Sequence, residues 1–268
     1  MSDLWNGKFR EPAFWQEIAG ALIALADLAP GMRVLDVGSA DGGTLFPALE
    51  RIGQTGSIVG IEVEEDLVAW LKAEIARRGI SNAENHLMDA RSTTFPDEAF
   101  DAAIMGMVGL DDDYDVETDE ILQDAPLTRE VYRVLKPGGF LYSSTWLRQD
   151  DNEWMGELIR RRLPHCTERG YFAGTEDGHV RLLRAVGFDG IQVVPFRGSY
   201  RFEDPAEWMA CVGYMWEQEL GEIKTDSIAL EAFEQDAYAL LAGHTRADGF
   251  IEYARTALLI RARKPQTS

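Results

Sequence analysis

Cysteine, basic residues and long apolar runs are all scarce in this sequence of 268 residues. The two cysteines, Cys166 and Cys211, are far apart and have no C-x-x-C spacing, so they form neither a zinc pattern nor a disulfide framework. The longest apolar segment, residues 18–29, contains Asp27 and is too short to cross a bilayer. The first residues lack the apolar run of a signal peptide. We therefore expect a cytoplasmic protein with reduced thiols, no metal and no membrane partner.

Positively charged residues are fewer than negatively charged ones: the chain has 26 Lys and Arg, 46 Asp and Glu, and a net charge of −20. A chain this acidic is repelled by phosphate backbones, which disfavours nucleic acid as a partner. Hydrophobic residues make up 46% of the chain, which is enough for a full core. The length allows one large domain or one domain with a sizeable insertion.

What the chain does contain is an alternation of predicted strands and helices. Buried apolar runs predict strands at residues 34–37, 57–61, 83–87, 100–105, 140–145, 191–194 and 257–260. Apolar residues at helical spacing predict helices at 12–29, 65–78, 127–135, 180–186 and 226–242, and one that begins at about Leu45. This alternation predicts the α/β class, with a mostly parallel sheet covered by helices on both faces.

The most informative segment is VLDVGSADGG at residues 34–43. An apolar strand with one acid, Asp36, leads into small residues at positions 38, 40, 42 and 43, after which a helical pattern begins. A glycine turn between a strand and a helix lets a ligand lie against bare backbone, where any Cβ would collide. The segment therefore predicts a site for a nucleotide-type cofactor.

Carboxylates follow two further predicted strands. Glu62 comes about twenty residues into the next unit, where a carboxylate can accept two hydrogen bonds from a ribose diol. Asp89 follows the third strand and could accept a hydrogen bond from an adenine amine. In an open α/β sheet, ligands bind beyond the carboxyl ends of the strands, so Asp36, Glu62 and Asp89 are expected at one edge.

Two cofactor classes compete for this site. The turn nearly matches the G-x-G-x-x-G/A fingerprint of dinucleotide enzymes, which leaves an NAD(P)-dependent oxidoreductase as an alternative. Asp36, however, would repel a pyrophosphate and suits a cofactor with a cationic amino-acid end, such as S-adenosylmethionine. A protein that kept the fold and binds the cofactor without catalysis is a further alternative.

Four segments resemble the class I S-adenosylmethionine-dependent methyltransferases, most closely the small-molecule branch with the ubiquinone- and menaquinone-type enzymes. They are residues 34–42, VGIEV at 59–63, FDAAIM at 100–105, and REVYRVLKPGG at 129–139. The last is the most specific, because dinucleotide enzymes have no such segment. The resemblance covers about residues 30–195 and 256–264, and it implies a Rossmann-like seven-stranded sheet whose last strand is antiparallel.

The resemblance also implies the residues that would bind S-adenosylmethionine: Asp36, Gly38, Ala40, Glu62, Val63, Asp89, Ala90 and Met105. The first three would line its methionine part, Glu62 its ribose, and the others its adenine ring or the space at the end of the fourth strand. One departure is Ala40, where the family usually has glycine. Alanine would fit this turn only with a negative φ.

The acceptor of the methyl group is expected to be a small molecule. We predict one domain over 1–268, with a helical cover at 1–29, a cofactor-binding core at 30–196 and 251–264, and a helical lid at 197–250. Candidate acceptor-binding residues are Met107, Tyr200, Trp208 and Tyr214.

Methyl transfer needs a general base only for a weakly acidic acceptor, so no catalytic residue is demanded; His165, His179 and His244 are candidates. The sequence does not determine the oligomeric state, and a homodimer is one state that it allows.

Overall fold

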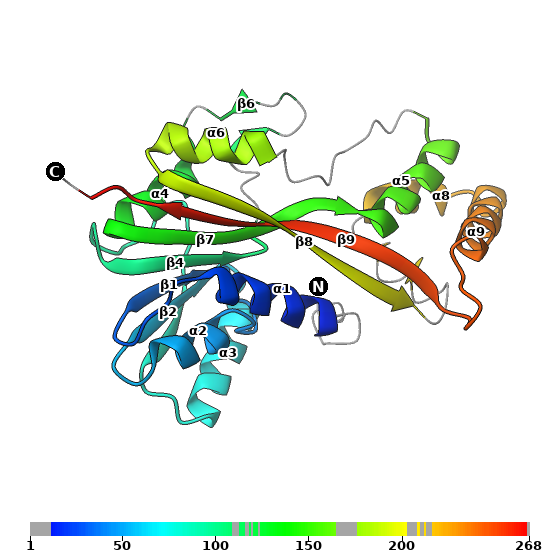
Figure 1. Cartoon of the computed structure of the whole chain (residues 1–268). Coiled ribbons are helices and arrows are strands. Elements are labelled where there is room, and N and C mark those ends of the chain that lie inside the picture. The colour runs from blue at the N-terminus through cyan, green and yellow to red at the C-terminus, as the bar shows by residue number, and fades with distance from the viewer. Residues whose placement is uncertain are drawn as a thin grey trace. The chain divides into compact units, whose positions relative to one another are not determined.

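The computed structural model describes residues 12–108, 113–115, 118, 120–122, 124–164, 176–202, 208–209, 212 and 216–266 (Figure 1). The chain divides into two compact units. The larger consists of Trp15–Leu147, Phe172–Phe196 and Ala257–Ser268. The smaller consists of Met1–Phe14, Arg148–Tyr171 and Arg197–Thr256.

A seven-stranded sheet organises the larger unit, in the order β3-β2-β1-β4-β7-β9-β8. Its strands are β1 (Arg33–Val37), β2 (Ser57–Glu62), β3 (Ala83–Leu87), β4 (Phe100–Gly106), β7 (Leu135–Gln149), β8 (Asp189–Phe202) and β9 (Ile251–Arg263). Strands β3, β2, β1, β4 and β7 pair in parallel. Strand β9 runs opposite to β7 and β8 (Figure 1), and beyond its end Lys264 exchanges backbone hydrogen bonds of 2.8 Å with Gly138 and Gly139. The predicted α/β fold with an antiparallel last strand is confirmed.

The helices of the larger unit are α1 (Pro12–Leu25), α2 (Leu45–Ile52), α3 (Glu65–Arg77), α4 (Pro126–Val134) and α6 (Glu176–Val186). Figure 1 shows α4 and α6 on one side of the sheet and α2 and α3 on the other. A core of fully buried side chains from β1, β2, β4 and β7 packs under α4 and α6. Helix α1 ends at Leu25, whereas the sequence predicts a helix over 12–29. Beyond its end, the N–H of Asp27 donates to the Tyr142 hydroxyl at 3.0 Å.

Strands β7, β8 and β9 are longer than the sequence predicts. Their predicted ranges were 140–145, 191–194 and 257–260, whereas the structure extends each to 13 residues or more. The added parts of β8 and β9 largely alternate between buried and more exposed residues, so they contain no continuous apolar run. Such alternation is typical of a strand that is covered on one face only.

The smaller unit contains α5 (Asp150–Arg162), α8 (Glu217–Ile223) and α9 (Ser227–Ala242), together with the remaining residues of β7, β8 and β9. Helix α9 confirms the helix predicted at 226–242, and the Asp226 carboxylate accepts the N–H of Ile228 at 2.9 Å as its cap. Helix α5 was not predicted. It carries the buried Asp151, which pairs with Arg255 of β9 at 2.6 Å.

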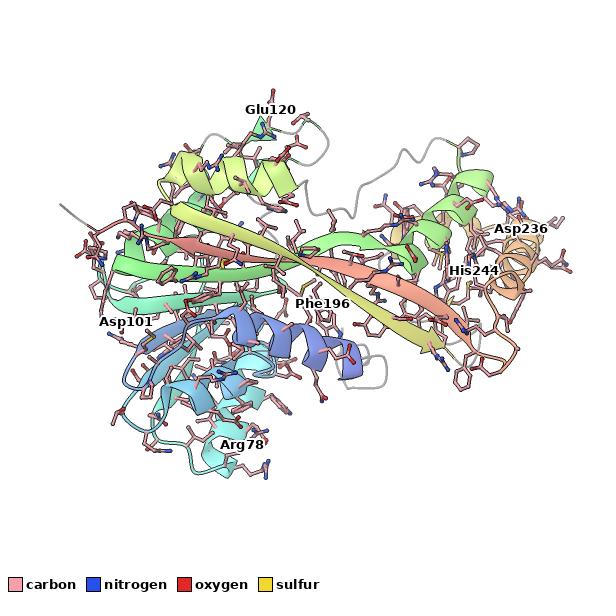
Figure 2. All side chains as sticks on the ribbon, in the orientation of Figure 1. Arg78, Asp101, Glu120, Phe196, Asp236 and His244 are labelled. Carbon is pink, nitrogen blue, oxygen red and sulfur yellow. The ribbon has the colours of Figure 1, made fainter. Side chains whose placement is uncertain are left out.

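An ion pair and a hydrogen bond lie at the amino end of the parallel strands. At the amino end, the Asp101 carboxylate, labelled in Figure 2, accepts the N–H of Arg33 at 2.8 Å and pairs with Lys136 at 2.6 Å. These contacts tie β4 to β1 and to the turn inside β7, and they use both oxygens of Asp101.

Along the ranges that the structure describes, no helix has the length and apolar composition needed to span a membrane.

Candidate functional site

A tight turn joins β1 to α2 at the carboxyl edge of the sheet. The N–H groups of Gly38 and Ser39 both donate to the carbonyl of Ile61, at 2.9 and 3.1 Å. Gly38 and Gly42 have φ values of +67° and +81°, which glycine adopts without strain. A Cβ on Gly38 would lie 2.4 Å from Val108 Cγ2, so the backbone at this turn must stay bare.

Asp36 lies at the base of this turn and is fully buried. One carboxylate oxygen, Oδ1, accepts the hydroxyl of Thr44 at 2.7 Å, whereas Oδ2 has no hydrogen-bond partner among the described residues. Burial raises the pKa of Asp36 to about 7; the Thr44 hydrogen bond opposes this rise and the nearby charge of Glu62 adds to it. A buried carboxyl group with one unsatisfied oxygen is suited to a cationic partner.

Glu62 closes the same turn from the end of β2. Its Oε2 accepts the N–H of Ala40 at 3.1 Å, and its Oε1 accepts the N–H of Val63 at 2.8 Å. The half-buried carboxylate thus links the two strand ends that the sequence places together. Its predicted contact with a ribose diol remains a prediction.

Ala40 departs from the sequence expectation in its backbone. The expectation was a negative φ, but the structure gives +41°, in the left-handed region. The hydrogen bond from its N–H to Glu62 holds the turn in this conformation. The expectation was wrong because the contacts of the whole turn decide φ, and they outweigh the steric cost of a positive φ for alanine.

Replacing Ala40 with glycine is therefore expected to stabilise the protein by about 1 kcal/mol or less, because glycine adopts positive φ without the steric cost that alanine has. Urea unfolding of the ligand-free protein measures this. Ala73→Gly, at an exposed position within α3, is the matched control and should destabilise by about 1 kcal/mol. A loss of stability in Ala40→Gly would contradict the strain at this position.

The predicted adenine neighbours differ in their surroundings. Val63 is 60% exposed, and Ala90 is half-buried against the core. Both carboxylate oxygens of Asp89 accept hydrogen bonds from Arg91, at 2.7 to 3.1 Å, and these bonds lower the pKa of Asp89. An adenine amine would therefore have to share Asp89 with Arg91, and this contact remains a prediction.

The two methionines at the end of β4 are in different positions. The side chain of Met105 is fully buried in the core. Met107 is half-buried, has a φ of +57°, and donates its N–H to the Ser144 hydroxyl at 2.9 Å. A non-glycine residue at positive φ at a strand end is a feature often found at functional sites. Met107 therefore has the more accessible side chain of the two.

Two strand glycines contribute to the site, and the sequence interpretation missed them. A Cβ on Gly106 would lie 2.6 Å from Thr44 Cγ2. A Cβ on Gly60 would lie 2.6 Å from Asn85 Oδ1, the atom that accepts the Ser39 hydroxyl at 2.8 Å across β2. A glycine inside an otherwise apolar strand often marks such a close approach, and this was the available signal.

The remaining candidates lie elsewhere or outside the described residues. In the smaller unit, Tyr200 is buried with its ring 5.7 Å from that of Tyr253, and Trp208 is fully buried. The ring of His244 stacks on Trp154 at 3.9 Å, and in the larger unit His179 is buried beside Tyr114. Tyr214 and His165 lie outside the described residues. Within the described part of the chain, no three His, Cys, Asp or Glu residues gather in a group that could hold a metal ion.

Comparisons with known proteins agree with this geometry. A family described as a methyltransferase domain matches residues 28–171, which include the glycine turn and the ends of β1, β2 and β4. Nocamycin O-methyltransferase of Saccharothrix syringae is 35% identical over 47% of this chain and 42% of its own length. The ubiquinone/menaquinone biosynthesis C-methyltransferase of Hydrogenovibrio crunogenus is 32% identical over 44% of each chain. The match thus spans less than half the length of these relatives.

A comparison of structures extends over more of the chain. The YcgJ protein of Bacillus subtilis superposes with a TM-score of 0.60, at 18% identity, and the match covers 94% of this chain and 99% of that one. At this identity the likeness establishes the fold.

Proposed function

Because this chain belongs to the class I S-adenosylmethionine-dependent methyltransferases, we propose that it transfers the methyl group of S-adenosylmethionine to a small-molecule acceptor. The observation that carries the proposal is the buried Asp36 behind the glycine turn, one of whose carboxylate oxygens has no hydrogen-bond partner within the part of the chain that the structure describes. The dinucleotide alternative lacks support, since the matched family is a methyltransferase domain.

The residues of the turn fit this cofactor. Among the described residues, the buried Asp36 Oδ2 has no hydrogen-bond partner, and the α-ammonium of the methionine part is a cation that would satisfy it. Gly38 must stay without a side chain, because a Cβ there would collide with Val108, and its φ of +67° allows the tight turn beside Asp36. Glu62 would accept the ribose hydroxyls, and the exposed Val63 and half-buried Ala90 would contact the adenine ring.

When bound, S-adenosylmethionine supplies a methyl group on a positively charged sulfur, which an acceptor lone pair can attack directly. The work of this chain is then to bind, to orient and to exclude water. Asp36 would fix the amino-acid end of the cofactor, and Glu62 would fix its ribose. Met107, Tyr200, Trp208 and Tyr214 remain the predicted acceptor residues, and residues 197–250 the predicted lid.

A small acceptor is favoured over a nucleic acid by the net charge of −20, because an acidic surface repels phosphates. The relatives whose names specify small-molecule pathways point to the same class. The cytoplasmic location and a homodimer remain predictions.

Calorimetry with S-adenosylhomocysteine and with NADP tests the proposed cofactor. We expect binding of S-adenosylhomocysteine alone; binding of NADP alone would contradict the proposal. Transfer of a labelled methyl group from S-adenosylmethionine to a panel of phenols, carboxylic acids, amines and thiols then tests the activity. Cofactor binding without turnover of any acceptor in a broad panel would favour the non-catalytic alternative.

A further inference from the structure

Thr44 is the residue before α2, and its hydroxyl has an unusual partner. Threonine at this N-cap position usually accepts a hydrogen bond from a backbone N–H of the first turn. Here the side chain makes no capping hydrogen bond. The hydroxyl instead donates to Asp36 Oδ1 at 2.7 Å, and the residue is only 8% exposed. The N–H of Phe46 donates instead to the carbonyl of Gly42 at 3.0 Å, so the side-chain contact of Thr44 is with Asp36 and not with the helix.

The methyl group of Thr44, the other branch of its side chain, lies beside Gly106. A Cβ on Gly106 would lie 2.6 Å from Thr44 Cγ2 but 3.6 Å from its Oγ1. Ile104 of β4 pairs with Asp36 of β1, so Gly106 is two residues further along β4 on the same face. The methyl group of Thr44 thus occupies the space that a side chain at Gly106 would need. Because Gly106 has no side chain, Thr44 can keep its methyl group in this space while its hydroxyl donates to Asp36.

We propose that Thr44 is a positioning residue, which occupies Asp36 Oδ1 and so leaves Oδ2 to receive the α-ammonium of S-adenosylmethionine. Gly106 is part of this device, because it gives Thr44 the room to adopt the required rotamer. The inference rests on the proposed function. The Thr44 hydrogen bond also lowers the pKa of Asp36 against the effect of burial, which favours the charged carboxylate that a cation needs.

Two ligands separate this role from a general structural one. S-adenosylhomocysteine carries the amino-acid end, whereas 5′-methylthioadenosine has the same adenosine without it. Calorimetry should show that Thr44→Val weakens S-adenosylhomocysteine binding about tenfold, the effect of losing one hydrogen bond to a charged group. Binding of 5′-methylthioadenosine should stay unchanged. Thr44→Ser, which keeps the hydroxyl, should restore most of the loss.

The Gly106 packing gives an independent set of variants. Gly106→Ala should displace Thr44 and weaken S-adenosylhomocysteine selectively, as Thr44→Val does. Adding Thr44→Ser to Gly106→Ala should recover affinity, because serine lacks the methyl group that the new Cβ would meet. This recovery of affinity tests the role of Thr44 even if Thr44→Val does not fold.

Thr128→Val is the matched control, because Thr128, at the start of α4, is a buried threonine whose hydroxyl donates to the buried Asp113. It should leave the ratio of the two affinities unchanged.

The inference is overturned if Thr44→Val leaves S-adenosylhomocysteine binding intact, or if it weakens both ligands equally. A double variant no better than Gly106→Ala would overturn the part assigned to Gly106. If the unmodified protein binds no S-adenosylhomocysteine, the proposed function fails, and this inference fails with it.

Discussion

Asp36→Asn is expected to weaken S-adenosylhomocysteine binding about 100-fold, which corresponds to about 2.7 kcal/mol. Asparagine keeps the size of the side chain and an oxygen for Thr44 but has no charge for the α-ammonium. Calorimetry at pH 8 measures the loss, with 5′-methylthioadenosine as the ligand whose affinity should not change. Equal affinity of the variant and the unmodified protein for S-adenosylhomocysteine would contradict the role of Asp36.

The same substitution should stabilise the ligand-free protein above neutral pH. The pKa of Asp36 is raised from 3.8 to about 7, so between these values the folded state binds a proton that the unfolded state has lost. The contribution of Asp36 to stability is therefore lost as the pH rises from about 4 through about 7, whereas asparagine does not titrate.

Urea unfolding at pH 5.5 and 8 should show that the stability advantage of Asp36→Asn grows with pH. Asp189→Asn is the control, because the pKa of Asp189 is shifted in the opposite direction: hydrogen bonds from Arg263 lower it. Replacing this carboxylate should therefore not stabilise the protein at pH 8. An advantage of Asp36→Asn that does not change with pH would show that desolvation of the charge is not its cause.

Glu62→Ala is expected to weaken S-adenosylhomocysteine binding by about 1–3 kcal/mol, through the loss of charge-assisted hydrogen bonds to the ribose. The structure adds a second reason, because Glu62 also accepts the N–H of Ala40 and so holds the turn in place. Adenosine should lose affinity along with S-adenosylhomocysteine, since both carry the ribose. This pattern distinguishes Glu62 from Asp36.

Glu64→Ala provides the matched control for Glu62→Ala, two residues along the chain and exposed. It should leave both affinities unchanged. Glu62→Gln keeps one oxygen that can accept the Ala40 N–H, so it should lose less than Glu62→Ala. Unchanged affinity in a folded Glu62→Ala variant would refute the ribose role.

Asp36, Gly38 and Glu62 could be identified before the structure because their signal is local. Each follows an apolar strand closely, and parallel strands bring their carboxyl ends to one edge. Thr44 could not be identified in this way, and a glycine in an apolar strand indicates a close approach at Gly60 and Gly106 but not its partner, which is distant in the sequence. Gly106 matters only because Thr44, 62 residues earlier, fills the space beside it. Similarly, Gly60 matters because Asn85 reaches Ser39 across β2.

The sequence by itself determined the class of the fold, the order of its main strands and helices, and the acids at the strand ends. These follow from hydrophobic periodicity and glycine placement, which act over a few residues. Only the tertiary structure decided the positive φ of Ala40, the burial of Met105 in the core, and which oxygen of Asp36 accepts the Thr44 hydroxyl. Each of these depends on packing and hydrogen bonding between segments far apart in the chain, and the folded protein satisfies those contacts all together.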